Sequence, residues 1–150
     1  MSSSDDRLDP DAYASEGGRL VDRNAARILE RYPVAHVERT RDTIQIDIRT
    51  SRDPERGVSI VVTPEAYELR LPTIEWTAGA YGPAPSTRYL KRVKVDNVSD
   101  KALAELIETA IARRDAEIIP CRYCSQPTPP EHRHGRACHG CAERQIGIVH

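Results

Sequence analysis

The chain has 150 residues, enough for one modest domain with a small appendage, and its 39% hydrophobic and 30% charged residues exclude wholesale disorder. Its net charge of −1 excludes a strongly positive overall charge that would attract nucleic acid. No apolar run is long enough to span a bilayer, and the start "MSSSDDRLDPD" lacks the basic and apolar regions of a secretory signal. We therefore expect a cytoplasmic protein with reduced thiols and no membrane partner.

The first 18 residues are predicted to form a flexible acidic tail. One arginine stands against five acidic residues there, a net charge of −4. A helix follows, because apolar residues recur at helical spacing and form one stripe: Val21, Ala25, Ile28, Leu29 and Tyr32. Pro33 disfavours helical geometry at the residue before it, so the helix ends there.

Alternating apolar and polar residues in the middle of the chain predict half-buried strands. The segment 43–50, "TIQIDIRT", carries isoleucine at every second position and polar residues between them. The segments 57–63 and 67–71 continue this pattern, and a shorter strand at 34–39 precedes them. Because the links between these strands are short and polar, we expect antiparallel hairpins.

The segment 72–87 is predicted to be a long loop. It carries Trp76, the only tryptophan, and also Tyr81 between glycine and alanine neighbours. One interpretation is a binding loop with two aromatic anchors, since such residues suit interface hot spots. The favoured interpretation is that Trp76 folds back and plugs the open end of the sheet, because tryptophan is mostly buried in proteins.

The segment 88–95 is predicted to be a further strand, and it holds the densest basic patch. Three cations are expected on one face of it: Arg88, Arg92 and Lys94. They could meet phosphates or an acidic partner. The near-neutral charge of the domain favours instead a solvated face paired with acids on neighbouring strands, such as Asp47 and Glu68.

A second helix is predicted from Ser99, its N-cap, to about Ala116. Its apolar stripe consists of Leu103, Leu106, Ile107, Ala110 and Ile111. The order of helix, several strands and helix predicts an α+β fold, with both helices packed on one face of an antiparallel sheet.

All four cysteines lie within 21 residues near the end of the chain: Cys121, Cys124, Cys138 and Cys141. Two C-x2-C pairs at this separation are typical of a tetrahedral zinc site in which four thiolates leave no position open. The surrounding segment has few large apolar residues, so it needs a metal in order to fold. Two disulfides or a redox C-x2-C are the alternatives, and a reducing compartment disfavours the disulfides.

These expectations divide the chain into an acidic tail (1–18), an α+β domain (19–119) and a zinc-binding module (120–150) with one structural Zn²⁺. Residues 121–147 resemble the four-cysteine zinc-ribbon and treble-clef-like zinc fingers. A treble clef would place the second cysteine pair at the start of a helix, whereas a ribbon would continue there as a strand. This segment also contains four histidines: His132, His134, His139 and His150. They are interpreted as neighbours of the metal site and not as its ligands.

The stretch between the cysteine pairs also resembles the His-Cys class of HNH nucleases. Glu131, His132 and His134 would stand at the D-H-x-H positions of that class. Only three residues separate His134 from Cys138, too few for the family's hairpin, and Ala142 stands where the family places a metal-binding asparagine. This resemblance implies at most a degenerate nuclease.

No enzyme signature is present, so no catalytic residue is assigned and the protein is predicted not to be an enzyme. The favoured function is a non-catalytic binding or regulatory protein that acts on another protein as an adaptor, regulator or immunity-type inhibitor. The alternative is nucleic-acid binding through the zinc module and the basic strand 88–94. The candidate binding surface consists of Trp76, Tyr81, Arg88, Arg92, Lys94, Arg133 and Arg136.

Overall fold

The computed structural model describes residues 16–53, 55–76 and 83–145, and its larger part is an antiparallel sheet with two long helices. The elements of this part are α3 (Glu16–Leu29), β1 (Val34–Arg39), β2 (Ile44–Ile48), β3 (Val58–Val62), β4 (Ala66–Trp76), β5 (Pro83–Lys94), the short 3₁₀ helix η1 (Val95–Asn97) and α4 (Asp100–Glu117). The five strands lie in the order β1-β2-β3-β4-β5, and each pairs antiparallel with the next. The predicted α+β class is confirmed.

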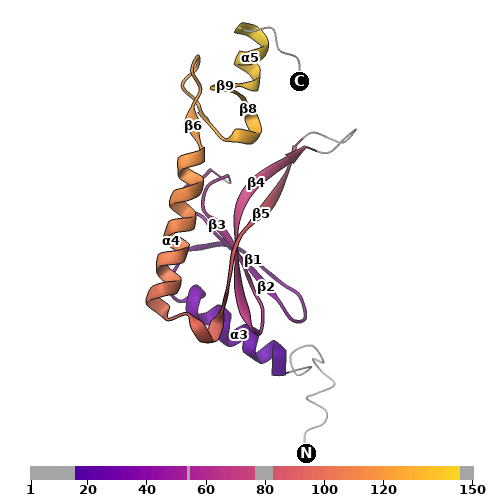
Figure 1. Cartoon of the computed structure of the whole chain (residues 1–150). Helices are drawn as coiled ribbons and strands as arrows, with labels where there is room; N and C mark the ends of the chain where they lie inside the picture. Colours follow the sequence, from indigo (N-terminus) through magenta and orange to yellow (C-terminus); the bar gives the residue numbers. More distant parts are fainter. Residues whose placement is uncertain (1–15, 54, 77–82, 146–150) are drawn as a thin grey trace, which may run out of the picture.

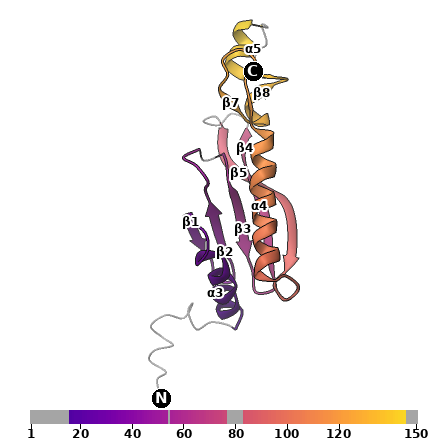
Figure 2. The same ribbon diagram turned by 90° about the vertical axis from the view of Figure 1, so that its left-hand side faces the viewer.

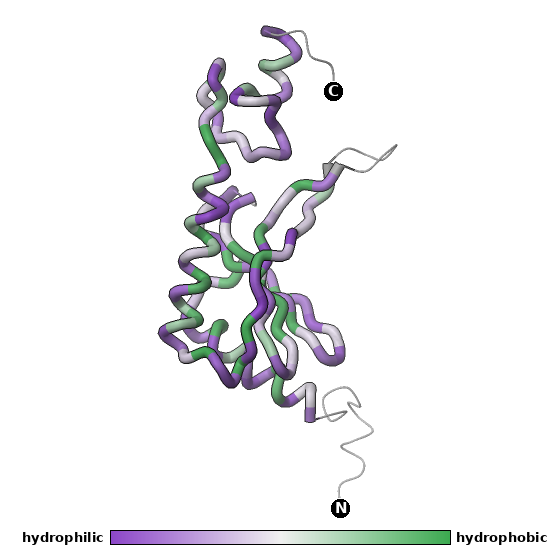
Figure 3. Tube along the Cα trace, in the orientation of Figure 1, coloured by the Kyte–Doolittle hydropathy of each residue, from purple (hydrophilic) through white to green (hydrophobic). Residues whose placement is uncertain are grey.

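Both helices cover the same face of the sheet (Figures 1 and 2). Helix α3 contacts β2 and β3, and α4 contacts β3 and β4. The core between them is aliphatic, and Figure 3 shows hydrophobic residues alternating with hydrophilic ones along the central strands. Every second residue of β2 is buried, as the isoleucine pattern predicts. None of the helices in the described part of the chain is long and apolar enough to cross a membrane.

Helix α3 begins at Glu16, three residues before position 19, where the predicted tail gives way to the α+β domain. Residues 16–18, assigned above to the acidic tail, therefore belong to the helix, and residues 1–15 lie outside the described residues. Asn24 fixes this helix to the sheet, because its buried amide donates to the carbonyl oxygens of Thr63 at 3.0 Å and Pro64 at 3.1 Å. The hydroxyl of Tyr67 donates in turn to the carbonyl oxygen of Asn24 at 2.8 Å.

The predicted N-cap of the second helix is confirmed, because the Ser99 side chain accepts a hydrogen bond from the Ala102 backbone nitrogen at 3.1 Å. Replacing Ser99 with alanine should lower the free energy of unfolding by about 1 kcal/mol, since a backbone donor of the first turn loses its partner. Urea denaturation followed by circular dichroism measures this. Ser99→Asp keeps an acceptor and should stay close to wild type; equal losses in both variants would contradict the role of the cap.

The predicted loop at 72–87 is wrong. β4 continues to Trp76 and β5 begins at Pro83, with these two residues paired at the end of a long two-stranded ribbon. β3 pairs with β4 only as far as Arg70, so Pro72 lies where β4 lacks a neighbour on one side and proline is tolerated. The remaining link at 77–82, which includes Tyr81, and the side chain of Trp76 lie outside the described residues.

The predicted common face of the three basic residues on β5 is also wrong. Leu69 pairs with Lys91 and Arg70 pairs with Tyr89, so one extra residue of β5 forms a bulge between them. The bulge reverses the alternation along the strand. The guanidinium of Arg88 consequently reaches α4. Beyond the bulge, an exposed Arg92 lies opposite Glu68, and Lys94 follows it two positions later.

Candidate metal centre

The C-terminal segment builds two small hairpins and a short helix beyond the end of α4 (Figure 1). Its elements are β6 (Ile119–Pro120), β7 (Pro127–Thr128), the 3₁₀ helix η2 (Pro130–His132), β8 (Arg133–His134), β9 (Ala137–Cys138) and α5 (His139–Gln145). β6 pairs with β7, and β8 pairs with β9. The turn between β6 and β7 carries the first cysteine pair, while the second pair spans the end of β9 and the first turn of α5.

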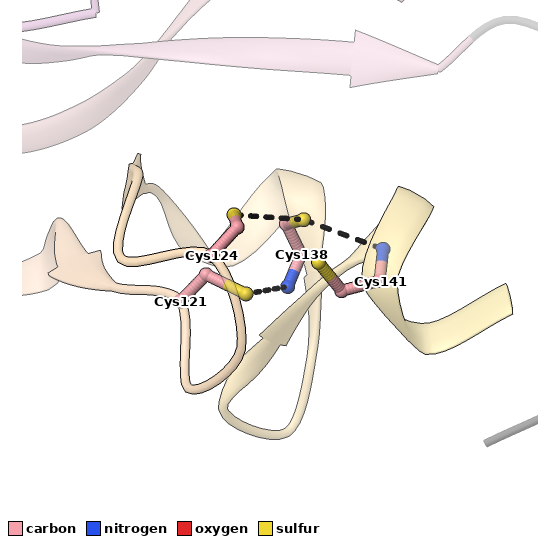
Figure 4. A group of neighbouring side chains, drawn as sticks. All are labelled: Cys121, Cys124, Cys138 and Cys141. Carbon is pink, nitrogen blue, oxygen red and sulfur yellow. Dashed lines mark hydrogen bonds between the residues drawn. The ribbon is translucent and has the colours of Figure 1, made fainter. Parts of the chain in front are cut away.

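The four cysteine side chains converge on one point (Figure 4). Their sulfur atoms all lie within 4.8 Å of one another, and the sulfurs of Cys124 and Cys138 are 3.9 Å apart. A tetrahedral ion with sulfur ligands at about 2.3 Å separates those sulfurs by about 3.8 Å. All four residues are free thiols in the structure and not disulfides. The cluster is therefore positioned to hold a metal ion, as the spacing predicts.

Backbone amides point at the sulfurs and favour their ionised form. Cys121 Sγ accepts from the nitrogens of Cys138 at 3.3 Å and Tyr123 at 3.4 Å, and Cys138 Sγ accepts from the Cys141 nitrogen at 3.5 Å. The amide of Cys138 lowers the pKa of Cys121 to about 6. Burial, together with the neighbouring sulfurs, raises the pKa of Cys141 to about 12. Ionisation of all four thiols at this separation would require a cation to offset their mutual repulsion.

Arginines lie in and next to the segments that carry the cysteines, and one of them contacts a sulfur. The guanidinium of Arg144 donates to Cys141 Sγ at 3.3 Å and offsets the negative charge of the thiolates. Arg122 lies over the ring of Tyr123, 5.8 Å from its centroid, and the Arg122 backbone nitrogen donates to the carbonyl oxygen of Arg136 at 2.8 Å. The side chains of Arg122, Tyr123, Arg136 and Arg144 are all exposed, and those of Arg122 and Tyr123 contact each other.

Within the described residues, the group that could hold a metal consists of the four cysteines and includes no histidine. His132 instead lies 3.1 Å from the carboxylate of Glu55, and its ring meets that of His139 edge-on at 6.3 Å. His134 is exposed on β8. The interpretation of these histidines as neighbours of the site agrees with this arrangement, and His150 lies outside the described residues.

Two arginines join the module to the α+β domain. Arg133, which belongs to the candidate binding surface, donates to the carbonyl oxygens of Glu117 at 2.7 Å and Thr128 at 3.0 Å. Arg114 of α4 is fully buried and binds the carboxylate of Glu131 in η2. Sequence reasoning did not single out Arg114. The available signal was its position, four residues after Ala110, where it continues the apolar stripe of the helix.

Comparison with protein-family models, with curated proteins and with solved structures finds no match. The function is therefore inferred from the cysteine cluster and from the residues around it.

Proposed function

We propose that the protein is a non-catalytic, zinc-containing binding or regulatory protein whose C-terminal module is a treble-clef-like finger. The support is the placement of the second cysteine pair, since Cys138 ends a hairpin and Cys141 lies in the first turn of α5. A zinc ribbon would continue there as a strand. Zinc is the favoured ion, because a tetrahedral set of four soft thiolates suits it.

The single observation that carries this proposal is the convergence of four sulfurs within 4.8 Å. Four thiolates complete a tetrahedral shell and leave no position for water or substrate, so the ion holds structure and performs no chemistry. Glu131, which the nuclease resemblance would place at the catalytic metal, uses both carboxylate oxygens to bind Arg114 at 3.0 Å and 2.8 Å. Because its carboxylate is occupied in this way, the pairing favours a non-catalytic protein over a nuclease.

Mass spectrometry of the gently purified protein tests the proposed ion. Under native conditions the chain should be heavier than under denaturing conditions by the mass of one zinc ion. Denaturation should release that ion, and a chromogenic chelator should then detect one equivalent. A metal-free chain that still has the folded C-terminal segment would refute the site, and the visible absorption of iron bound by thiolates would refute the choice of zinc.

The favoured partner is another protein. The overall charge of −1 gives no global attraction to nucleic acid, and the exposed Tyr123 beside Arg122 and Arg136 suits a contact of mixed apolar and polar character. Affinity capture with the wild-type chain and with a Tyr123→Ala/Arg136→Ala variant tests this. The same partner should be retained by the wild type and lost by the variant; equal retention would place the contact elsewhere.

Nucleic-acid binding through the module is the second candidate, because the module exposes Arg122, Arg136 and Arg144 as well as Tyr123. A tyrosine ring can stack on a base while arginines meet phosphates. This candidate predicts that the logarithm of the affinity for single-stranded nucleic acid falls with the logarithm of salt, by about 0.7 for each phosphate contacted. Lack of binding at low salt would eliminate it.

A further inference from the structure

Arg114 is a fully buried charged side chain, with 0% of its surface exposed. A guanidinium removed from water is stable only when acceptors satisfy its donors. Burial alone would lower the pKa of Arg114, but the hydrogen bonds that it donates to Glu131 and Glu117 outweigh burial and raise it. The side chain therefore stays charged and depends on its carboxylate partners.

The partners of Arg114 come from three separate segments of the chain. Its Nε donates to the carbonyl oxygen of Glu55, in the link between β2 and β3, at 2.8 Å. One terminal nitrogen donates to Glu117 at the end of the same helix at 3.0 Å. The two terminal nitrogens together bind both carboxylate oxygens of Glu131 in η2, at 3.0 Å and 2.8 Å, in a forked geometry. Glu131 is thus the main partner, and it alone belongs to the cysteine module.

The position of Glu131 depends on the fold of that module. Glu131 lies seven residues after Cys124 and seven residues before Cys138, so the two cysteine pairs hold the segment that presents it. The buried apolar cluster around these cysteines is very small: Cys121, Ala137, Cys141 and Ala142, with Cys138 packed against them. So small a cluster cannot keep Glu131 in place once the sulfurs are no longer tied together.

We propose that metal occupancy of the cysteine cluster is coupled to the stability of the α+β domain through the buried Arg114–Glu131 pair. This inference rests on the proposed zinc site. Loss of the metal withdraws Glu131 and leaves a buried guanidinium with fewer acceptors, which loosens the end of α4 and the β2–β3 link. Coupling is reciprocal, so Glu131 also raises the metal affinity of the cluster without touching the ion. Glu131 is then a positioning residue, and metal binding in the module changes the stability of the α+β domain.

Hydrogen exchange of the full-length chain, with zinc bound and after chelation, tests the coupling. In the wild type, chelation should speed exchange by about tenfold or more at residues 107–118 and in the β2–β3 link, because both surround Arg114. The variant Glu131→Gln keeps the shape but not the charge of the side chain. Its exchange in these segments should already be fast with zinc bound and should change little on chelation.

Competition with a chelator of known affinity provides the second readout. Glu131→Gln should bind zinc about tenfold or more weakly than the wild type, since the coupling acts in both directions. The matched control is Glu143→Gln, which removes an exposed carboxylate of α5 in the same module and should match the wild type in both measurements.

The outcomes separate the coupling from the zinc site itself. If chelation removes the zinc but exchange around Arg114 stays the same in the wild type, the coupling is refuted and the zinc site stands. Unchanged zinc affinity in Glu131→Gln refutes it as well. If the chain binds no zinc, both proposals fail, and the metal analysis shows this before any exchange is measured. Should Glu131→Gln fail to fold, the wild-type comparison with and without zinc still decides the matter.

Discussion

Serine in place of Cys141 should abolish binding of the proposed zinc ion and unfold residues 119–145, while the five-stranded sheet keeps its structure. Cys141 is 3% exposed and lies in the first turn of α5, with its sulfur within 4.8 Å of the other three. Serine is a poor ligand for zinc, and in zinc-finger peptides the bound ion contributes about 10–16 kcal/mol to folding. The small cluster of buried residues in this segment cannot replace that contribution.

Zinc release to a chromogenic chelator measures this effect, and two-dimensional NMR of the amides shows which residues lose dispersion. Tyr123→Ser is the matched control, because it changes an exposed side chain within the first cysteine turn and keeps all four sulfurs. The control should retain one zinc ion. A Cys141→Ser chain with a stably bound ion and a folded α5 would show that the fourth sulfur is dispensable, and the complete thiolate shell would have to be abandoned.

Methionine in place of Arg114 should lower the free energy of unfolding by about 3–5 kcal/mol, because it leaves Glu131 and Glu117 without their buried cation. The side chain of Glu131 is only 14% exposed, so water cannot fully take the place of the guanidinium. Native domains have about 5–15 kcal/mol of stability in total, so this variant should unfold at a much lower urea concentration.

Arg113→Met provides the matched control, since it removes a neighbouring arginine that is exposed on the same helix. Its free energy of unfolding should change by no more than about 0.5 kcal/mol. Adding Glu131→Gln to Arg114→Met should recover part of the loss, because the uncompensated carboxylate is then removed as well. Equal effects of the two arginine replacements would contradict the importance of the buried network.

Several parts of the fold could be predicted from local patterns. The isoleucines of β2 alternate with a period of two, and this alternation correctly predicts which of its residues are buried. The spacing of the four cysteines predicts a common site because each C-x2-C turn brings its own two sulfurs together. Ser99 predicts the start of α4 through the chemistry of its own hydroxyl. In each case the residues that carry the pattern are themselves the residues that form the strand, the turn or the helix cap.

The errors fall where distant segments decide the outcome. The bulge in β5 depends on how this strand pairs with Leu69 and Arg70 of β4, so the face of Arg88 could not be read from alternation alone. The segment 72–87 contains prolines and glycines typical of a loop, yet pairing across the hairpin extends both strands. The hydrogen bond from Arg133 to the carbonyl oxygen of Glu117 likewise joins residues 16 positions apart, and no local pattern indicates it.

Periodicity and short-range spacing were enough to predict the α+β class, the antiparallel hairpins and the four cysteines of the candidate metal site. The ion network around Arg114, which joins the module to the α+β domain, became visible only in the folded chain. Arg114 and Glu131 are 17 residues apart, and Glu55 is 59 residues from Arg114. A charged side chain enters the interior only when acceptors from such separate segments converge on it, and no local pattern records that convergence.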